Sequence, residues 1–252
     1  MIIKDIHFKR EIDFNHSGNN GKATSGDPGY NQIISTISHE LRTPVAVIKS
    51  NIQLLRKFSY DMDGPILEDS FSLCEESVND VARFLDNIQL LNSANKSRIH
   101  PVYTAFRTKR IIRHLYRWLG ESNLDYRRIS LKWDLKDHEI ISDQKYVSQI
   151  LLNILSNALK FSKEKVQFII ATHNQELSIL VQDWGIGIPG EEIEMIFHPF
   201  CRASNVKHFS GTGLGLAIVH AMVENLGGEI QVSSDFGKGT TIHIIIPYEL
   251  SN

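Results

Sequence analysis

Cysteine and long apolar runs are both scarce in this chain of 252 residues. Its two cysteines, Cys74 and Cys201, stand far apart and outside any CxxC spacing, which argues against a disulfide framework and a four-ligand zinc site. No stretch reaches the roughly 18 apolar residues that a membrane-spanning helix needs. The opening residues are charged early and lack the apolar core of a signal peptide. We therefore expect a cytoplasmic protein with no membrane span.

A strong excess of charge of either sign is also missing. Lys and Arg number 27 against 29 for Asp and Glu, a formal net charge of −2, which argues against a chain that coats nucleic acid. The charge is nevertheless unevenly placed. Residues 61–95 hold eight acidic residues and one basic residue, whereas residues 96–136 hold eleven basic and three acidic residues. This switch, close to Pro101, predicts a module boundary near residues 95–101.

The first part of the chain predicts a linker and a helical hairpin. Residues 15–29 read NHSGNNGKATSGDPG and are too polar to form a core. Apolar residues then recur at helical spacing from Ile34 to Leu55 and again from Ile66 to Leu91, with a break at Asp61–Pro65. A hairpin of two helices has no closed core, so we expect a second copy to complete a four-helix bundle.

The remaining residues mix helices and strands, which predicts an α/β sandwich. The expected helices cover residues 108–119, 143–161 (capped by Asp143) and 213–226. The expected strands cover residues 129–135, 166–172, 177–183, 229–233 and 240–247. The predicted fold class is therefore α+β, a dimeric helical hairpin followed by an α/β sandwich. The predicted domains are a tail at 1–29, the hairpin at 30–97 and the sandwich at 98–252.

A His-Glu pair on the first helix is the first candidate site. His39 lies about 200° round the helix from the apolar Leu41, so it is expected to face solvent. A partly neutral histidine can act as a nucleophile, and the adjacent Glu40 can hold its ring proton. Thr43, one turn further on, shares the face of His39. Taken alone, the pair is more commonly just a solvated histidine on a helix surface.

Two asparagines and a lysine within QILLNILSNALKFS form the second candidate site. Asn153 and Asn157 lie four residues apart and share a helix face, and Lys160 follows one turn on. Asparagine is a poor choice for a packed helix interior. The set therefore suggests oxygen ligands for a hard cation beside a phosphate-binding ammonium. A polar helix face with a hydrogen-bonded pair explains the spacing equally well.

Two glycine-rich segments are the remaining candidates. Asp183 ends a strand and is followed by Gly185 and Gly187, a pattern that suits an exocyclic amine and a flat ligand close to the backbone. Gly211, Gly213, Leu214 and Gly215 open the last helix, where free amides bind phosphate. The aperiodic stretch 197–210, with Arg202, Lys207 and His208, resembles a basic lid. A plain glycine turn and a surface loop are the alternatives.

The order of these segments resembles that of the sensor histidine kinases. Five segments of the chain are similar, in order, to the H, N, G1, F and G2 boxes of that family. They are His-Glu-Leu-Arg-Thr-Pro at 39–44, Asn-x-x-x-Asn-Ala-x-Lys at 153–160, Asp-x-Gly-x-Gly-Ile at 183–188, Pro-Phe-x-Arg at 199–202 and Gly-x-Gly-Leu-Gly-Leu at 211–216. The resemblance covers about residues 30–248. It implies a dimeric phosphoacceptor hairpin and an ATP-binding domain of the Bergerat type, as in gyrase B and Hsp90-like proteins.

The resemblance also implies roles for single residues. His39 matches the phosphorylated histidine, Glu40 its acidic neighbour, and Thr43 the residue that positions water for dephosphorylating the partner. In the ATP-binding domain, Asn157 matches the magnesium-binding asparagine, with Asn153 and Lys160 beside the phosphates. Asp183 matches the acid that reads adenine, and Gly185 and Gly187 its loop. Arg202 matches a phosphate-contacting arginine. Gly211, Gly213, Leu214 and Gly215 match the end of the lid.

The implied activity is ATP- and Mg²⁺-dependent autophosphorylation of His39 by a homodimer, with transfer to an aspartate of a response regulator receiver domain and phosphatase activity toward that regulator. A non-catalytic, dimeric ATP-binding scaffold is the alternative. Two positions depart from the family pattern, because Trp184 is large for its place in the G1 box and Cys201 replaces an aromatic residue. The bases around Arg113 lack a nucleic-acid-reading motif, so a solvated helix face is expected there.

Overall fold

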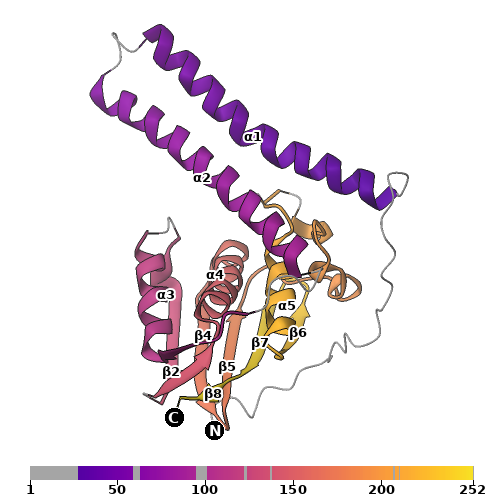
Figure 1. The fold of residues 1–252 in the computed structure, drawn as a ribbon. Helices are drawn as coiled ribbons and strands as arrows, with labels where there is room; N and C mark the ends of the chain where they lie inside the picture. Colours follow the sequence, from indigo (N-terminus) through magenta and orange to yellow (C-terminus); the bar gives the residue numbers. More distant parts are fainter. Residues whose placement is uncertain are drawn as a thin grey trace. The chain divides into compact units, whose positions relative to one another are not determined.

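The structure, a computed structural model, describes residues 28–58, 63–94, 101–121, 124–136, 138–206, 208–209 and 211–251 (Figure 1). These residues form two compact units, a helical one up to Leu90 and a mixed one from Leu91 onward. The linker predicted at residues 15–29 lies outside the described residues, except that its last two residues already belong to the first helix.

The helical unit is the predicted hairpin. Helix α1 spans Pro28–Phe58 and helix α2 spans Gly64–Ala94. The break in the apolar pattern falls at the start of α2. Leu67 N donates to Asp63 O at 3.1 Å, which closes the first helical turn. Pro65, which has no amide proton, lies in that turn, where a helix tolerates proline. Phe84 is buried and the Cys74 thiol reaches Ile48 O on α1 at 3.9 Å. The two helices therefore pack along one seam of the hairpin.

The mixed unit is built on a five-stranded sheet with the order β2-β4-β5-β7-β6. Its strands are β2 (Ile129–Asp134), β4 (Val166–His173), β5 (Glu176–Asp183), β6 (Glu229–Asp235) and β7 (Gly239–Pro247). Strands β2 and β4 run parallel, and every other neighbouring pair is antiparallel. These five strands lie within two residues of the predicted bounds.

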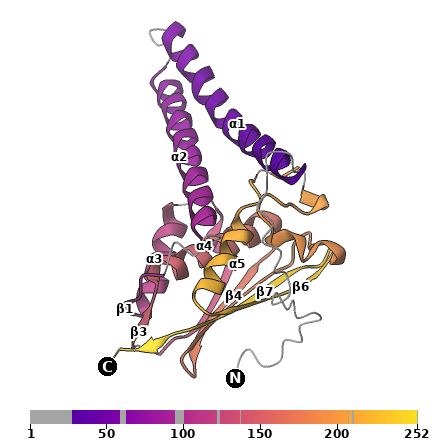
Figure 2. The same cartoon turned by 45° about the vertical axis from the view of Figure 1, so that its right-hand side comes forward.

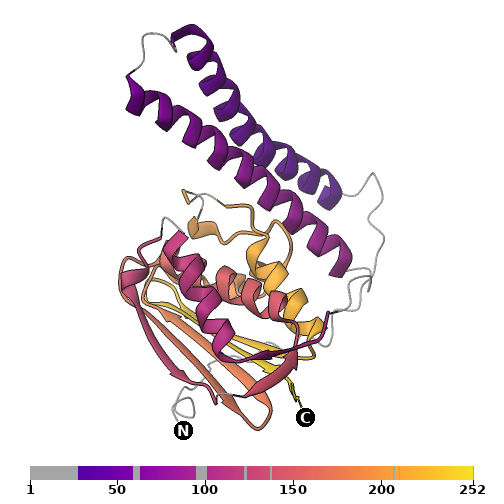
Figure 3. The same ribbon diagram turned by 60° about the vertical axis from the view of Figure 1, so that its left-hand side comes forward.

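Three helices cover one face of this sheet, as Figures 2 and 3 show. They are α3 (Lys109–Glu121), α4 (Gln144–Phe161) and α5 (Gly215–Asn225). Ile154 and Leu155 of α4 are buried together with Phe168 and Ile179 of the sheet. Asp143 caps α4 as predicted, because its side chain accepts from the amides of Lys145 and Tyr146. Because α4 packs its apolar face on the sheet, its polar side chains lie on the remaining faces of the helix.

A second, three-stranded sheet was not predicted. It has the order β1-β3-β8 and consists of Thr104–Arg107, Glu139–Ser142 and Glu249–Leu250. Strands of two to four residues carry too few alternating positions to be recognised from a sequence. The hairpin followed by an α/β sandwich is otherwise confirmed. None of the described helices is long and apolar enough to cross a lipid bilayer.

Candidate nucleotide and phosphoacceptor sites

The His-Glu pair lies open on the surface of α1. The His39 side chain is 74% exposed, and its Nδ1 atom lies 3.7 Å from Oε1 of Glu40. The exposure follows from the position of His39 away from the apolar seam, as the helical spacing predicts. With Nδ1 nearest the carboxylate, the other ring nitrogen, Nε2, is left for a different partner. The pair thus provides an accessible nucleophile with a nearby proton acceptor.

Thr43 lies one turn beyond this pair on the same exposed face. Its hydroxyl donates to the backbone carbonyl of His39 at 3.5 Å, a bond at the long limit of hydrogen bonding. The hydroxyl oxygen keeps its lone pairs for a second partner such as water. Thr43 therefore presents a hydroxyl group on α1 one turn after His39.

In the mixed unit, α4 presents its polar residues to the start of α5. A Cβ atom built on Gly215 would lie 3.4 Å from Oδ1 of Asn153 and 3.9 Å from Nδ2 of Asn157. A Cβ atom built on Gly211 would lie 3.0 Å from Nζ of Lys160. The structure therefore brings together the second and fourth candidate sites of the sequence. The space beside these side chains exists because the two glycines lack a Cβ.

The side-chain amide of Asn153 needs a hydrogen-bond acceptor at this site. Its Nδ2 atom is buried and has no hydrogen-bond partner within the part of the chain that the structure describes. A buried amide without a partner costs about 1–3 kcal/mol, so such groups are normally satisfied by a ligand or water. An unsatisfied donor and a lysine ammonium beside backbone amides at a helix start suit phosphate oxygens. The residues present thus fit the triphosphate of a nucleotide.

Asp183 lies at the end of β5 on the helix-covered side of the sheet and is 8% exposed. Its Oδ1 accepts the backbone N–H of Gly185 at 2.8 Å. Burial raises the pKa of this carboxyl from 3.8 to about 6, although the amides of Gly185 and Thr240 act in the opposite direction. A carboxylate held this way can accept a hydrogen bond from an exocyclic amine. Thr240 was not singled out from the sequence, because it lies far from Asp183 along the chain.

The glycines after Asp183 are required by close packing within the chain itself. A Cβ on Gly185 would lie 2.3 Å from the carbonyl oxygen of Phe161, at the end of α4. Gly187 has a φ of +62°, and a Cβ there would lie 2.1 Å from Asp235 O. The close approach of backbone to a flat ligand, which the sequence interpretation expects at these glycines, stays a prediction beside these contacts within the chain. The contacts within the chain are to α4 and to the β6–β7 turn, and they fix the position of Asp183.

The described residues of the lid segment, 197–206 and 208–209, make more backbone hydrogen bonds than the aperiodic sequence predicts. The segment contains a 3-10 turn at Ser204–Val206. Phe200 adopts a φ of +65° and donates its N–H to Gly213 O at 3.1 Å, which joins the two ends of the segment. The Asn205 side chain donates to Gly187 O at 2.8 Å. Asn205, which sequence reasoning missed, thereby ties the lid to the loop after Asp183.

Arg202 is bound to the lid rather than turned to the N-terminus of α5. Its guanidinium donates to Val206 O at 2.7 Å and also to Phe209 O. These are backbone acceptors four and seven residues further along the same segment. The structure therefore shows Arg202 as a brace within the lid. Both bonds come from Nη2, so the phosphate contact expected of Arg202 would fall to its other N–H groups and stays a prediction. Lys207 lies outside the described residues.

Family models match both units of the chain. The model of the His Kinase A (phospho-acceptor) domain matches residues 30–96. The model of the histidine kinase-, DNA gyrase B- and HSP90-like ATPase matches residues 142–250. Each matched segment contains the candidate residues described above for that unit.

Curated relatives are similar over most of this chain. The signal transduction histidine-protein kinase ArlS of Staphylococcus haemolyticus is 31% identical over 85% of the chain. The autoinducer 2 sensor kinase/phosphatase LuxQ of Vibrio cholerae is 32% identical over 87%, and the sensor histidine kinase WalK of Bacillus subtilis is 31% identical over 86%. The chain spans 48% of ArlS, 26% of LuxQ and 36% of WalK.

Solved structures share the fold. The Acinetobacter baumannii histidine kinase AdeS matches 85% of this chain and 98% of its own with a TM-score of 0.60 at 24% identity. The histidine kinase ThkA, solved in complex with the response regulator protein TrrA, matches 86% of this chain and 61% of its own with a TM-score of 0.58 at 22% identity.

Proposed function

Because the chain belongs to the histidine kinases, with a His Kinase A phospho-acceptor domain followed by a gyrase B- and HSP90-like ATPase domain, we propose that it transfers the γ-phosphoryl group of ATP to its own His39. The observation that carries the proposal is the meeting of Asn153, Asn157 and Lys160 with the glycines that open α5. The candidate phosphoryl acceptor is His39, whose side chain is 74% exposed on α1. We place the domain boundaries at residues 29–30 and 97–98.

The chemistry follows from the positions of the side chains. His39 attacks the γ-phosphorus with the lone pair of Nε2, while Glu40 stabilises the proton on Nδ1 across the 3.7 Å separation. The new N–P bond forms as the bond between the γ-phosphorus and the β,γ-bridging oxygen breaks, and ADP leaves with that oxygen. Glu40 then closes to hydrogen-bond distance and takes the proton from Nδ1, which leaves the ring of the phosphohistidine neutral and its phosphoryl group anionic. Lys160 and the amides at the start of α5 stabilise the negative charge on the phosphates.

Asn157 is the residue that we assign to Mg²⁺. Its side-chain oxygen is a hard ligand of the kind that magnesium uses together with phosphate oxygens and water. The described residues contain no group of three or more His, Cys, Asp or Glu side chains suited to a metal, so an all-protein metal cage is not the basis of this assignment. When bound, Mg²⁺ supplies neutralisation of the charge that develops between the β- and γ-phosphates.

The acting unit is a homodimer through the hairpin. The hairpin leaves a set of large apolar side chains exposed, comprising Ile34, Val45, Ile52, Leu54, Phe58, Ile66, Phe71, Leu73, Val78 and Leu85. So many exposed apolar residues on two helices exceed what a stable monomeric surface tolerates. A second copy offers the same surface, so a two-fold four-helix bundle buries both sets at once.

The phosphoryl group on His39 passes to an aspartate of a response regulator receiver domain in the cytoplasm. Support for this partner comes from the relatives, which are named as signal transduction and sensor kinases, and from ThkA, which was solved with the regulator TrrA. We further propose that the chain dephosphorylates its regulator, as the name of LuxQ states for that protein. Thr43, whose hydroxyl lies 3.5 Å from the backbone carbonyl oxygen of His39, would hold the attacking water.

Retention of label from γ-³²P-ATP tests the proposal. We expect wild-type chain to keep the ³²P and to release ADP, and Asn157→Ala to lose both Mg-ATP affinity and label while melting at the wild-type temperature. Lys165→Ala, an exposed lysine beyond α4, is the matched control and should label normally. An ATP-binding scaffold would bind Mg-ATP in calorimetry and retain no label, and that result would reject the kinase proposal.

A further inference from the structure

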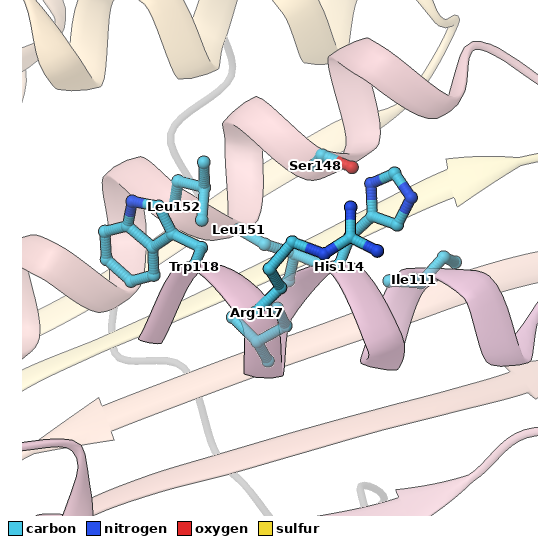
Figure 4. Close-up of a pocket in the computed structure, with 8 residues that line it drawn as sticks. Ile111, His114, Arg117, Trp118, Ser148, Leu151 and Leu152 are labelled. Atoms are coloured by element: carbon cyan, nitrogen blue, oxygen red, sulfur yellow. The ribbon is translucent and has the colours of Figure 1, made fainter. Parts of the chain in front are cut away.

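A small groove lies between α3 and α4, away from every residue assigned above. Its volume is about 160 Å³. Figure 4 shows the side chains that line it, with Trp118 and Leu152 at one end and the polar groups of Ser148, His114 and Arg117 toward the other. Ser148 and Leu152 belong to α4, but they lie about 140° round that helix from Asn153 and Asn157, respectively. The groove is thus distinct from the nucleotide site on the same helix.

The polar end of the groove consists of hydrogen-bond donors. Ser148 Oγ is buried and has no hydrogen-bond partner within the part of the chain that the structure describes. Gln144 Nε2 donates to His114 Nε2 at 3.2 Å, so the neutral imidazole carries its proton on Nδ1 and can donate there. Arg117 makes no ion pair or hydrogen bond with the described residues, and none of the side chains that line the groove is acidic. This end therefore suits an anion.

The other end is apolar and sets the size of the ligand. Leu151 forms a buried floor, and the Trp118 ring and Leu152 form the walls. A cavity of about 150 Å³ holds one benzene ring, whereas pockets for larger ligands measure about 300–1,000 Å³. A volume of about 160 Å³ therefore admits one ring and excludes a nucleotide.

We propose that this groove binds a small monocarboxylate with a single aromatic ring or a branched chain of similar size. The ring lies on Leu151 between Trp118 and Leu152, and the carboxylate accepts from the Arg117 guanidinium and the Ser148 hydroxyl. One guanidinium suits a singly charged acid better than a dianionic phosphate, because no second fixed cation lines the groove. The proposal is independent of the kinase chemistry, since none of these side chains takes part in it.

The test uses phenylacetate as the probe and phenylacetamide as its neutral isostere. The whole chain is labelled with ¹⁵N-tryptophan, which gives three indole signals for Trp118, Trp133 and Trp184. Phenylacetate should shift the Trp118 signal, with a dissociation constant on the order of 1 mM for a ligand of this size. Phenylacetamide should bind at least about tenfold more weakly, because it lacks the charge that pairs with Arg117.

Variants on both helices separate this site from unspecific binding. Arg117→Gln should weaken phenylacetate about tenfold and Ser148→Ala about threefold, while Arg113→Gln, an exposed arginine of α3 outside the groove, should leave binding unchanged. The remaining indole signals report whether each variant is folded. Equal binding of acid and amide, wild-type affinity in Arg117→Gln, or shifts confined to Trp133 or Trp184 would overturn the proposal.

Discussion

At the scale of single residues, the candidate sites include a polar group whose charged form lowers the stability of the fold, because the group is buried. Asp183 is the clearest case, because burial raises the pKa of its carboxyl to about 6. The change from 3.8 to about 6 corresponds to about 3 kcal/mol in favour of the neutral acid. In the folded chain the acid therefore holds its proton at a pH at which the unfolded chain has lost it. The contribution of Asp183 to folding stability falls as the pH rises from about 4 to about 6.

This cost predicts opposite effects of Asp183→Asn on stability and on binding. Above pH 6 the variant should be more stable than wild type, by up to about 3 kcal/mol, because no buried charge forms and the amide oxygen still accepts from Gly185. Its affinity for ATP should fall about tenfold, because the carboxylate no longer accepts from an exocyclic amine. Thermal melts at pH 4 and pH 7.5 and calorimetric titration with ATP measure both effects. A variant destabilised at pH 7.5 would contradict the account.

At the scale of elements, the site is made where α4, α5 and the loop after β5 meet. The apolar periodicity of the sequence predicted α4, α5 and the five strands of the large sheet, since each of these elements spans enough residues to show its repeat. It could not show that Gly185 and Gly187 serve contacts with Phe161 and Asp235, because sequence separation hides such packing. Sequence separation also hides the tie from Asn205 to Gly187. The bracing role of Arg202 was missed for another reason, because its acceptors lie only four and seven residues away in a segment whose aperiodic sequence does not indicate its backbone conformation.

Gly215→Ala tests the meeting of α4 and α5. The added methyl group would lie 3.4 Å from Asn153 Oδ1, an ordinary contact that leaves no space for a phosphate oxygen between them. The helix should tolerate alanine or gain up to about 1 kcal/mol from its propensity. We expect Mg-ATP affinity to fall roughly tenfold through the displaced phosphate contact. Gly190→Ala, where an added Cβ meets nothing within 4 Å, is the matched control and should bind normally. Equal affinities for the two variants would place the phosphates elsewhere.

At the scale of the whole molecule, the proposed homodimer follows from the exposed apolar residues of the hairpin. Light scattering should give a mass of about twice 28.7 kDa at micromolar concentration. Val78→Glu should shift the mass toward the monomer, because Val78 belongs to this apolar set and is 54% exposed in one copy. Asn79→Glu adds the same charge at the neighbouring exposed position and should leave the dimer intact. A monomeric wild-type chain would refute the bundle.

The most direct measurement of the central claim is the chemical stability of the phosphorylated chain. Label from γ-³²P-ATP should be lost in acid and persist in base, as expected of a phosphorus–nitrogen bond. His39→Gln should abolish labelling and leave the affinity for Mg-ATP unchanged, because His39 and the nucleotide residues belong to different units of the chain. Label that survives acid, or that remains on the His39→Gln chain, would contradict the assignment of His39 as the phosphoryl acceptor.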